Sequence, residues 1–156
     1  YLDVGCNTGE MSSRIAIATT AQVTGIDINQ SRIEEARKKY DIENLIFVAG
    51  DATKEILPGK FGTIILSNVL EHIVERTAFL ERLKELYCPA QLLLRVPNFE
   101  RDWRVPLKKE LGVDYFLDST HEIEHSPNEL LKEIEMSGSR ILELQCRWGE
   151  IWALIR

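Results

Sequence analysis

The sequence lacks any apolar run long enough to cross a membrane, and it has no N-terminal stretch with the features of a secretory signal. Only three of its 156 residues are cysteines, Cys6, Cys88 and Cys146, and no Cys-x-x-Cys pair occurs. Three widely spaced cysteines do not form a disulfide framework, so we expect reduced thiols. These absences disfavour a disulfide-stapled secreted protein and predict a cytoplasmic protein without a membrane span.

A surplus of basic residues is also missing. The chain carries 25 Asp and Glu against 19 Lys and Arg, for a net charge of −6. Because proteins grip phosphate backbones with Lys and Arg, a nucleic-acid partner is disfavoured. Hydrophobic residues make up 44% and charged residues 28%, as in an ordinary globular protein. We expect one domain over residues 1–156, with upstream elements missing because Tyr1 already begins a strand; no pattern indicates an oligomeric state.

Short aliphatic runs alternate with amphipathic stretches along the first two thirds of the chain. Strands are expected over residues 1–4, 22–27, 45–49, 62–67 and 91–96, and helices over 9–18, 29–40, 52–56 and 70–87. The strands are continuously apolar, as is typical of a sheet covered on both faces. The alternation predicts an α/β fold: a doubly wound, Rossmann-like, mostly parallel sheet with helices on both faces.

Two helix starts have capping signals. Ser31 with Glu34 predicts a capping box, and Ser126 followed by Pro127 predicts an N-cap with proline at the first helical position. The second helix ends near Gly138, and apolar runs 140–146 and 150–156 then flank Trp148-Gly149. This pattern predicts a hairpin that supplies an antiparallel last strand.

Glycine and polar residues follow each of the first four predicted strands. They are the loop Asp3-Val4-Gly5-Cys6-Asn7-Thr8-Gly9, then Asp27, then Gly50-Asp51-Ala52, then Ser67-Asn68. The carboxyl ends of parallel strands meet at one edge of a sheet, where such folds bind ligands. Glycines let a ligand approach the backbone and the helix N-terminus beyond, and an acid at the end of the second strand can accept two ribose hydroxyls.

The glycine loop departs from the dinucleotide fingerprint Gly-x-Gly-x-x-Gly. Asn7 takes the place of the second glycine and Glu10 that of the third. An acid where strand and helix must pack closely, near a pyrophosphate, disfavours NAD. An NAD-dependent oxidoreductase therefore stays as a less favoured alternative, and a tight turn without a ligand stays open for the loop alone.

Taken in order, these motifs resemble those of class I S-adenosylmethionine-dependent methyltransferases, in particular the small-molecule, ubiquinone-type group. The resemblance covers residues 1 to about 97 and implies S-adenosylmethionine as the cofactor. It places the glycine loop under the methionine portion, Asp27 at the ribose, Asp51 at the adenine and Asn68 near the sulfonium. The residues it implies for cofactor binding are Asp3, Gly5, Cys6, Asn7, Gly9, Asp27, Ile28, Asp51, Ala52 and Asn68.

Residues 97–125 form the one long connection expected to be irregular, and long connections at a ligand-binding edge are usually functional. We expect this segment to bind a small-molecule methyl acceptor whose nucleophile is an oxygen. The segment is similar to one in a bacterial and archaeal subgroup that often accompanies sugar or lipid biosynthesis. A module that binds adenosylmethionine or a nucleotide without catalysis remains the alternative.

Two histidines are the catalytic candidates. The resemblance places His72 beside the methyl group, and His121 can act as a general base near neutral pH. A surface histidine bonded to a nearby loop is an equally open interpretation of His121.

The segment from His121 to His125 reads His-Glu-x-x-His, the zinc-protease motif, which requires a helix. Pro127 disfavours a helix there, so we expect an extended segment with His121, Ile123 and His125 on one side and the glutamates on the other. Glu71-His72 with His121 is similar to the metal site of small-RNA 2′-O-methyltransferases. Those enzymes carry a further glutamate where Asn68 stands, so no metal is expected.

Several other charged and aromatic residues near this segment are expected to be structural. Acids dilute the basic residues, which predicts a solvated surface, and the two C-terminal tryptophans are expected to pack in the hairpin. These residues are Arg95, Arg101, Arg104, Lys108, Lys109, Trp148 and Trp152.

Overall fold

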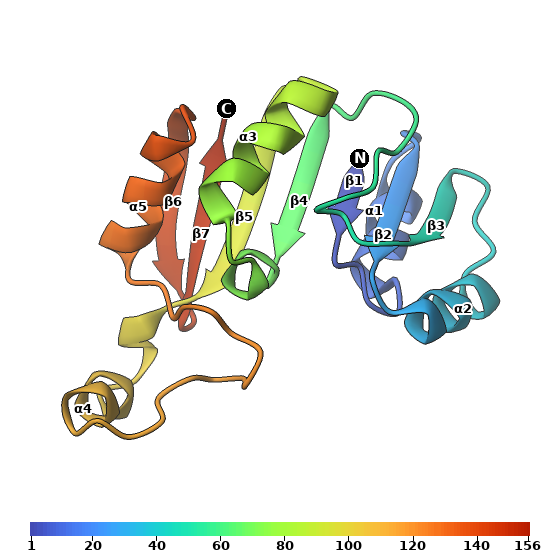
Figure 1. Ribbon diagram of the computed structural model, residues 1–156. Helices are drawn as coiled ribbons and strands as arrows, with labels where there is room; N and C mark the ends of the chain where they lie inside the picture. Colours follow the sequence, from blue (N-terminus) through green and yellow to red (C-terminus); the bar gives the residue numbers. More distant parts are fainter.

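The computed structural model describes all residues from 1 to 156 as one seven-stranded sheet with helices on both faces (Figure 1). The strands are β1 (Leu2–Val4), β2 (Val23–Asp27), β3 (Leu45–Ala49), β4 (Thr63–Ser67), β5 (Gln91–Pro97), β6 (Ile141–Arg147) and β7 (Glu150–Ile155). Their order is β3-β2-β1-β4-β5-β7-β6. β1 to β5 are parallel, and β7 runs antiparallel between β5 and β6. The predicted fold class is confirmed.

Two separate cores cover the two faces of the sheet. α1 (Glu10–Ala18) and α2 (Gln30–Lys39) pack with β2 and β3 around Val23, Ile33 and Phe47. α3 (Arg76–Tyr87) and α5 (Pro127–Met136) pack on the other face in a larger cluster of 20 buried residues. Successive strand residues point to opposite faces, so a continuously apolar strand serves both cores.

The C-terminal hairpin is confirmed. β6 and β7 pair antiparallel from Arg147 and Glu150 onward, so Trp148 and Gly149 form the connection. Both connecting residues have positive φ, 53° and 79°. A two-residue turn with this geometry follows the twist of the paired strands.

One predicted helix cap is confirmed and the other is wrong. Ser126 and Glu129 form a reciprocal capping box at the start of α5, with Pro127 as the first helical residue. At α2 the cap is Asn29, whose side chain accepts hydrogen bonds from the backbone N–H groups of Ser31 and Arg32. Asn and Ser are comparable caps, and the Asn29 side chain satisfies two N–H groups that the helix leaves free.

Two predicted helices are also corrected. Residues 52–56 form a turn without a helix, because Asp51 Oδ1 accepts from both the backbone N–H and the hydroxyl of Thr53. The stretch 70–87 is interrupted: a 3₁₀ turn, η1 (Leu70–His72), precedes an extended Ile73, and α3 begins only at Arg76. Ile73 keeps its carbonyl outside the helix, where the Arg76 guanidinium donates to it.

The segment 97–125 is more ordered than expected. It contains a 3₁₀ turn, η2 (Phe99–Arg101), and a helix, α4 (Arg104–Glu110), which lies away from the sheet beyond the end of β5 (Figure 1). The rest of the segment, residues 111–125, returns along the carboxyl edge of the sheet toward α5 and is called the returning segment below. None of the helices combines the length and apolar character needed to cross a bilayer.

Candidate active site

The loop after β1 is built by backbone conformations that few residues adopt. Gly5, Asn7 and Gly9 all have positive φ, of 69°, 53° and 80°. Asn tolerates this region better than most side chains do. The backbone N–H groups of Gly5 and Cys6 both donate to the carbonyl of Ile26, which ties the loop to the end of β2.

Asp27 organises the neighbouring turn. It is buried at the end of β2, where Oδ2 accepts from the backbone N–H of Asn7 at 2.8 Å and Oδ1 accepts from that of Asn29 at 2.8 Å. Each carboxylate oxygen retains acceptor capacity for a ligand. Asp27 is therefore both a brace of the loop and a candidate acceptor for ligand hydroxyls.

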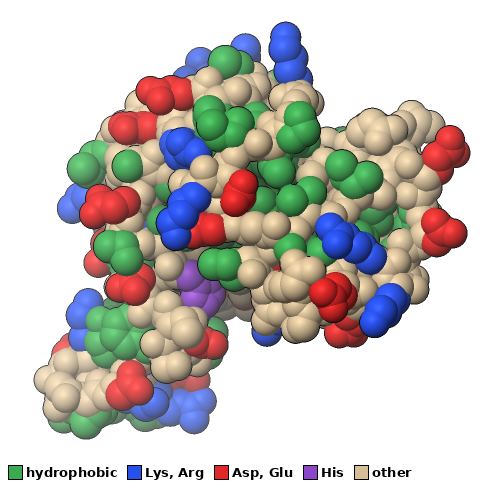
Figure 2. All heavy atoms as spheres, turned by 45° about the vertical axis from the view of Figure 1, so that its right-hand side comes forward, with side chains coloured by type: hydrophobic (Ala, Val, Ile, Leu, Met, Phe, Trp, Pro, Cys, Tyr) green, Lys and Arg blue, Asp and Glu red, His purple; other side chains and the backbone are tan.

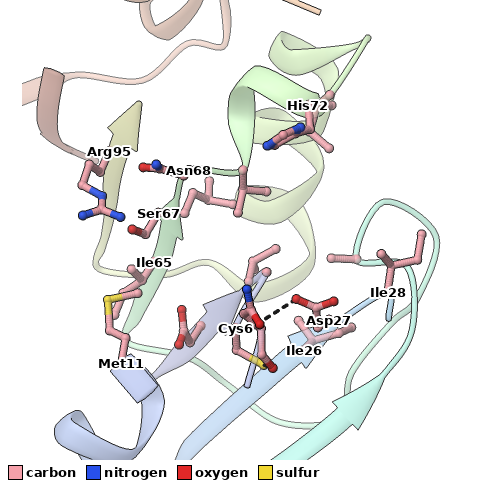
Figure 3. Close-up of a pocket in the computed structure, with 18 of the residues that line it drawn as sticks. Cys6, Met11, Ile26, Asp27, Ile28, Ile65, Ser67, Asn68, His72 and Arg95 are labelled. Carbon is pink, nitrogen blue, oxygen red and sulfur yellow. Dashed lines mark hydrogen bonds between the residues drawn. The ribbon is translucent and has the colours of Figure 1, made fainter. Parts of the chain in front are cut away.

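A cavity of about 1120 Å³ opens at the carboxyl ends of the parallel strands. Figure 3 shows Asp27 and Ile28 on one side of it, with Asn68, Arg95 and His72 on the other. Of the ten residues that the sequence predicts for cofactor binding, nine line this cavity: Asp3, Gly5, Cys6, Asn7, Asp27, Ile28, Asp51, Ala52 and Asn68. Gly9 does not line the cavity. An added Cβ there would lie 2.4 Å from the Phe47 ring, so the lack of a side chain at Gly9 lets the start of α1 pack closely against β3.

The acidic groups of the cavity differ in their environments. Burial raises the pKa of Asp3 to about 6, even though Ser12 donates a hydrogen bond to it. Lys54 and Thr53 lower the pKa of Asp51 to about 2. Burial raises the pKa of the Cys6 thiol, which makes this residue part of the wall and not a nucleophile.

Beyond Asn68, three residues converge from two distant parts of the chain. Glu71 and His72 come from η1, and His121 comes from the returning segment, with the two imidazole centroids 4.7 Å apart. One polar side-chain atom of each residue, an imidazole nitrogen or a carboxylate oxygen, lies within 4.8 Å of the corresponding atoms of the other two. Figure 2 shows histidine side chains in a recess beside the protruding lobe of the molecule.

Hydrogen bonds fix the tautomers of both histidines. His121 Nδ1 lies 2.8 Å from Glu124 Oε1, a carboxylate that can only accept, so Nδ1 carries the proton. His72 Nδ1 lies 2.9 Å from the Thr120 hydroxyl, whose own proton goes to Asp118. His72 Nδ1 therefore donates as well, and in the neutral form of each ring Nε2 keeps a free lone pair.

Glu71 is the most unusual group of the cluster. It is 1% exposed, and neither carboxylate oxygen has a hydrogen-bond partner. Burial, together with the charges of Glu150 and Glu124, raises its pKa to about 7. A buried carboxylate without partners is costly, so this arrangement points to a binding partner that supplies the missing contacts.

Several expectations about the returning segment are corrected. Residues 121–125 are not helical, as predicted from Pro127, but Glu124 is buried beside His121 and does not lie on the opposite side. Arg101 is largely buried in an ion pair with Glu124, and Arg95 lies over the Trp152 ring in the cavity wall. No local pattern in the sequence indicates these contacts, because their partners lie on other elements.

Comparison with known proteins places this chain in a family. Residues 2–90 match the family model described as a methyltransferase domain. The ubiquinone biosynthesis O-methyltransferase of Bradyrhizobium diazoefficiens is 32% identical over 142 residues, which cover 84% of this chain and 54% of the relative. The enzyme of the same name from Actinobacillus pleuropneumoniae is 30% identical over 158 residues, 92% of this chain and 67% of the relative. The chain thus spans between half and two thirds of the length of these relatives.

Solved structures share the fold across the whole chain. Magnesium protoporphyrin IX methyltransferase from Synechocystis PCC 6803 with bound SAH has a TM-score of 0.75 and 24% identity, covering 99% of this chain and 72% of that one. An S-adenosylmethionine-dependent methyltransferase from Mesorhizobium loti has a TM-score of 0.76 and 14% identity, covering 99% and 89%. With the family match over more than half of its length, the chain belongs to the class I S-adenosylmethionine-dependent methyltransferases.

Proposed function

We propose that this protein transfers the methyl group of S-adenosylmethionine to a hydroxyl oxygen of a small-molecule acceptor. The observation that carries the proposal is the cluster of Glu71, His72 and His121. His72 lines the cavity on the other side from Asp27 (Figure 3), while Glu71 and His121 adjoin His72 without lining the cavity. The cofactor would span the cavity from Asp27 toward Asn68, and the acceptor would enter from the side of residues 97–125. The names of the curated relatives support an oxygen acceptor.

In this arrangement the cofactor rests on backbone and acidic groups. The loop from Gly5 to Asn7 would hold the methionine portion, Asp27 would accept from the ribose hydroxyls, and Asp51 with Ala52 would hold the adenine; all of these residues line the cavity. Methyl transfer then needs in-line alignment of donor and acceptor in a site shielded from water. The positive charge of the sulfonium disappears in the reaction, so the protein needs no strong electrostatic stabiliser for a new charge.

Asp27→Ala is expected to weaken S-adenosylmethionine binding by about two orders of magnitude or more, because two charge-assisted hydrogen bonds to the ribose are lost. The variant also leaves the N–H groups of Asn7 and Asn29 without acceptors, so the free energy of unfolding should fall by about 1–3 kcal/mol. Calorimetric titration measures the first effect and denaturant unfolding the second. Asp41→Ala, at an exposed acid, is the control; unchanged affinity in Asp27→Ala would remove Asp27 from the site.

The acceptor hydroxyl must lose its proton as it is methylated, and we propose His121 as the base that takes it. His121 does not itself line the cavity, but its ring packs against that of His72, which does. His121 Nδ1 is already a donor to Glu124, so Nε2 is the free base. A methyl-transfer assay over a panel of hydroxyl, amine and thiol compounds, read by mass spectrometry, tests the proposal. Transfer to hydroxyl compounds is expected; exclusive transfer to nitrogen or sulfur would contradict the oxygen acceptor.

A second role for the same cluster is favoured by Glu71. Two imidazoles and a carboxylate within 4.8 Å of one another suit a divalent cation such as Zn²⁺ or Mn²⁺, and a cation would satisfy the carboxylate that has no protein partner. The three residues therefore fit a metal ion, although the sequence, with Asn68 in place of a further glutamate, predicts none. A bound cation would polarise the acceptor oxygen and lower the pKa of its proton.

Metal removal separates the two roles. If a cation assists, dialysis against a chelator should lower turnover by at least about 10-fold, and one divalent cation should restore it, while S-adenosylhomocysteine still binds. Glu71→Gln should abolish the restoration. Full activity after exhaustive chelation, with no metal in the protein by mass spectrometry, would contradict the cation role and leave His121 as the direct base.

A further inference from the structure

The structure contains two largely buried groups of three residues, each made of an arginine, a glutamate and a histidine, and we call them triads. In one, Glu124 bridges Arg101 and His121: Oε2 accepts from Arg101 at 2.6 Å and Oε1 lies 2.8 Å from His121 Nδ1. In the other, Glu133 bridges Arg76 and His125, at 2.7 Å and 2.9 Å. Neither triad lines the cavity, but the histidine of the first one packs against His72, which does.

We propose that Glu124 is a positioning residue that holds His121 in one orientation with Nε2 free of a proton. The inference rests on the proposed function, because His121 must offer that lone pair whether it accepts the acceptor's proton directly or ligates a cation. Glu124 itself is fully buried and does not line the cavity, so it would act through His121.

The surroundings of Glu124 leave it little freedom. Its side chain is 0% exposed, and besides Arg101 and His121 it accepts from the backbone N–H of Leu117 at 2.6 Å. Arg101 is held in turn, since its guanidinium also donates to the carbonyl of Asn98 at the end of β5. The ion pair keeps the carboxylate an acceptor only, so the His121 proton is confined to Nδ1.

Backbone hydrogen bonds on either side of Glu124 fix the path of the returning segment. The backbone N–H of Glu122 donates to the carbonyl of Glu71, and Phe99 N–H donates to the carbonyl of His125. Glu124 thus connects the end of β5, the loop at Leu117 and the imidazole in one rigid unit. Orienting a reactive imidazole through a carboxylate on its other nitrogen is a general device for bases and for metal ligands alike.

The test compares two glutamates of matched chemistry. Glu124→Gln replaces the carboxylate by an amide that can donate to Nδ1, so His121 should shift toward the Nε2-protonated tautomer in ¹⁵N NMR spectra of the resting protein. Turnover at saturating acceptor should fall by about 10- to 100-fold, with S-adenosylhomocysteine affinity unchanged within about 2-fold. Glu133→Gln should disturb His125 instead and leave turnover near that of the unchanged protein.

Glu124→Asp is the second variant if the glutamine variant does not fold. It retains a carboxylate for Arg101 but withdraws it from His121, and the same loss of turnover is expected. An unchanged His121 tautomer in Glu124→Gln, or an equal loss of turnover in Glu133→Gln, would overturn the proposal. A shifted tautomer with full turnover would confirm the positioning of His121 and contradict its role in the proposed function.

Discussion

Replacing Gly5 with valine is expected to abolish binding of S-adenosylmethionine while leaving the sheet folded. Gly5 has φ of 69°, a conformation that a β-branched residue adopts only with strain. A Cβ at this position would also lie 2.6 Å from Val69 Cγ2, in the connection that follows β4. The substitution therefore displaces both the loop after β1 and the segment of Asn68 and Val69, which are two walls of the cavity.

Gly112→Val is a closely matched control for this experiment. Gly112 has nearly the same φ, 68°, but an added Cβ there would meet no atom within 4 Å. The Gly112→Val variant should lose stability through backbone strain alone, without a side chain that displaces the cavity walls. Its affinity for the cofactor should be preserved. Calorimetric titration with S-adenosylhomocysteine and circular dichroism measure the two properties; normal binding by a folded Gly5→Val variant would show that the loop does not contact the cofactor.

The second large effect is expected at His121. His121→Ala should lower turnover on a hydroxyl acceptor by about 10²- to 10⁴-fold, the usual contribution of a general base, while cofactor affinity stays the same. His121 is not the surface histidine of the alternative interpretation, because its side chain is only 5% exposed and packs against His72. Its neighbour Glu122 is exposed, so Glu122→Ala is the control. Full turnover in His121→Ala would leave this residue with a structural role only.

The cofactor end of the site could be predicted because it depends on local sequence. In a parallel sheet every residue that follows a strand comes to the same edge, so Asp27, Asp51 and Asn68 lie together once the strands are identified. Their positions follow from the alternation of strands and helices, which is a strong pattern in this chain.

The acceptor end could not be predicted in the same way. His72 meets Thr120 across 48 residues, and Arg101 meets Glu124 across 23, within a segment that has no hydrophobic periodicity. Glu71 looked like part of a helix, yet η1 ends at His72 and the chain extends through Ile73 before α3 begins. Such contacts arise from tertiary packing, which overrides the local propensity on which sequence interpretation depends.

A crystal structure with bound S-adenosylhomocysteine tests the central claim most directly. The account predicts the ribose hydroxyls within hydrogen-bond distance of Asp27, and the sulfur at the Asn68 end of the cavity, facing His72 and His121. A product bound with its ribose away from Asp27, or with its sulfur turned away from the two histidines, would contradict the assignment of the cavity and of the acceptor end.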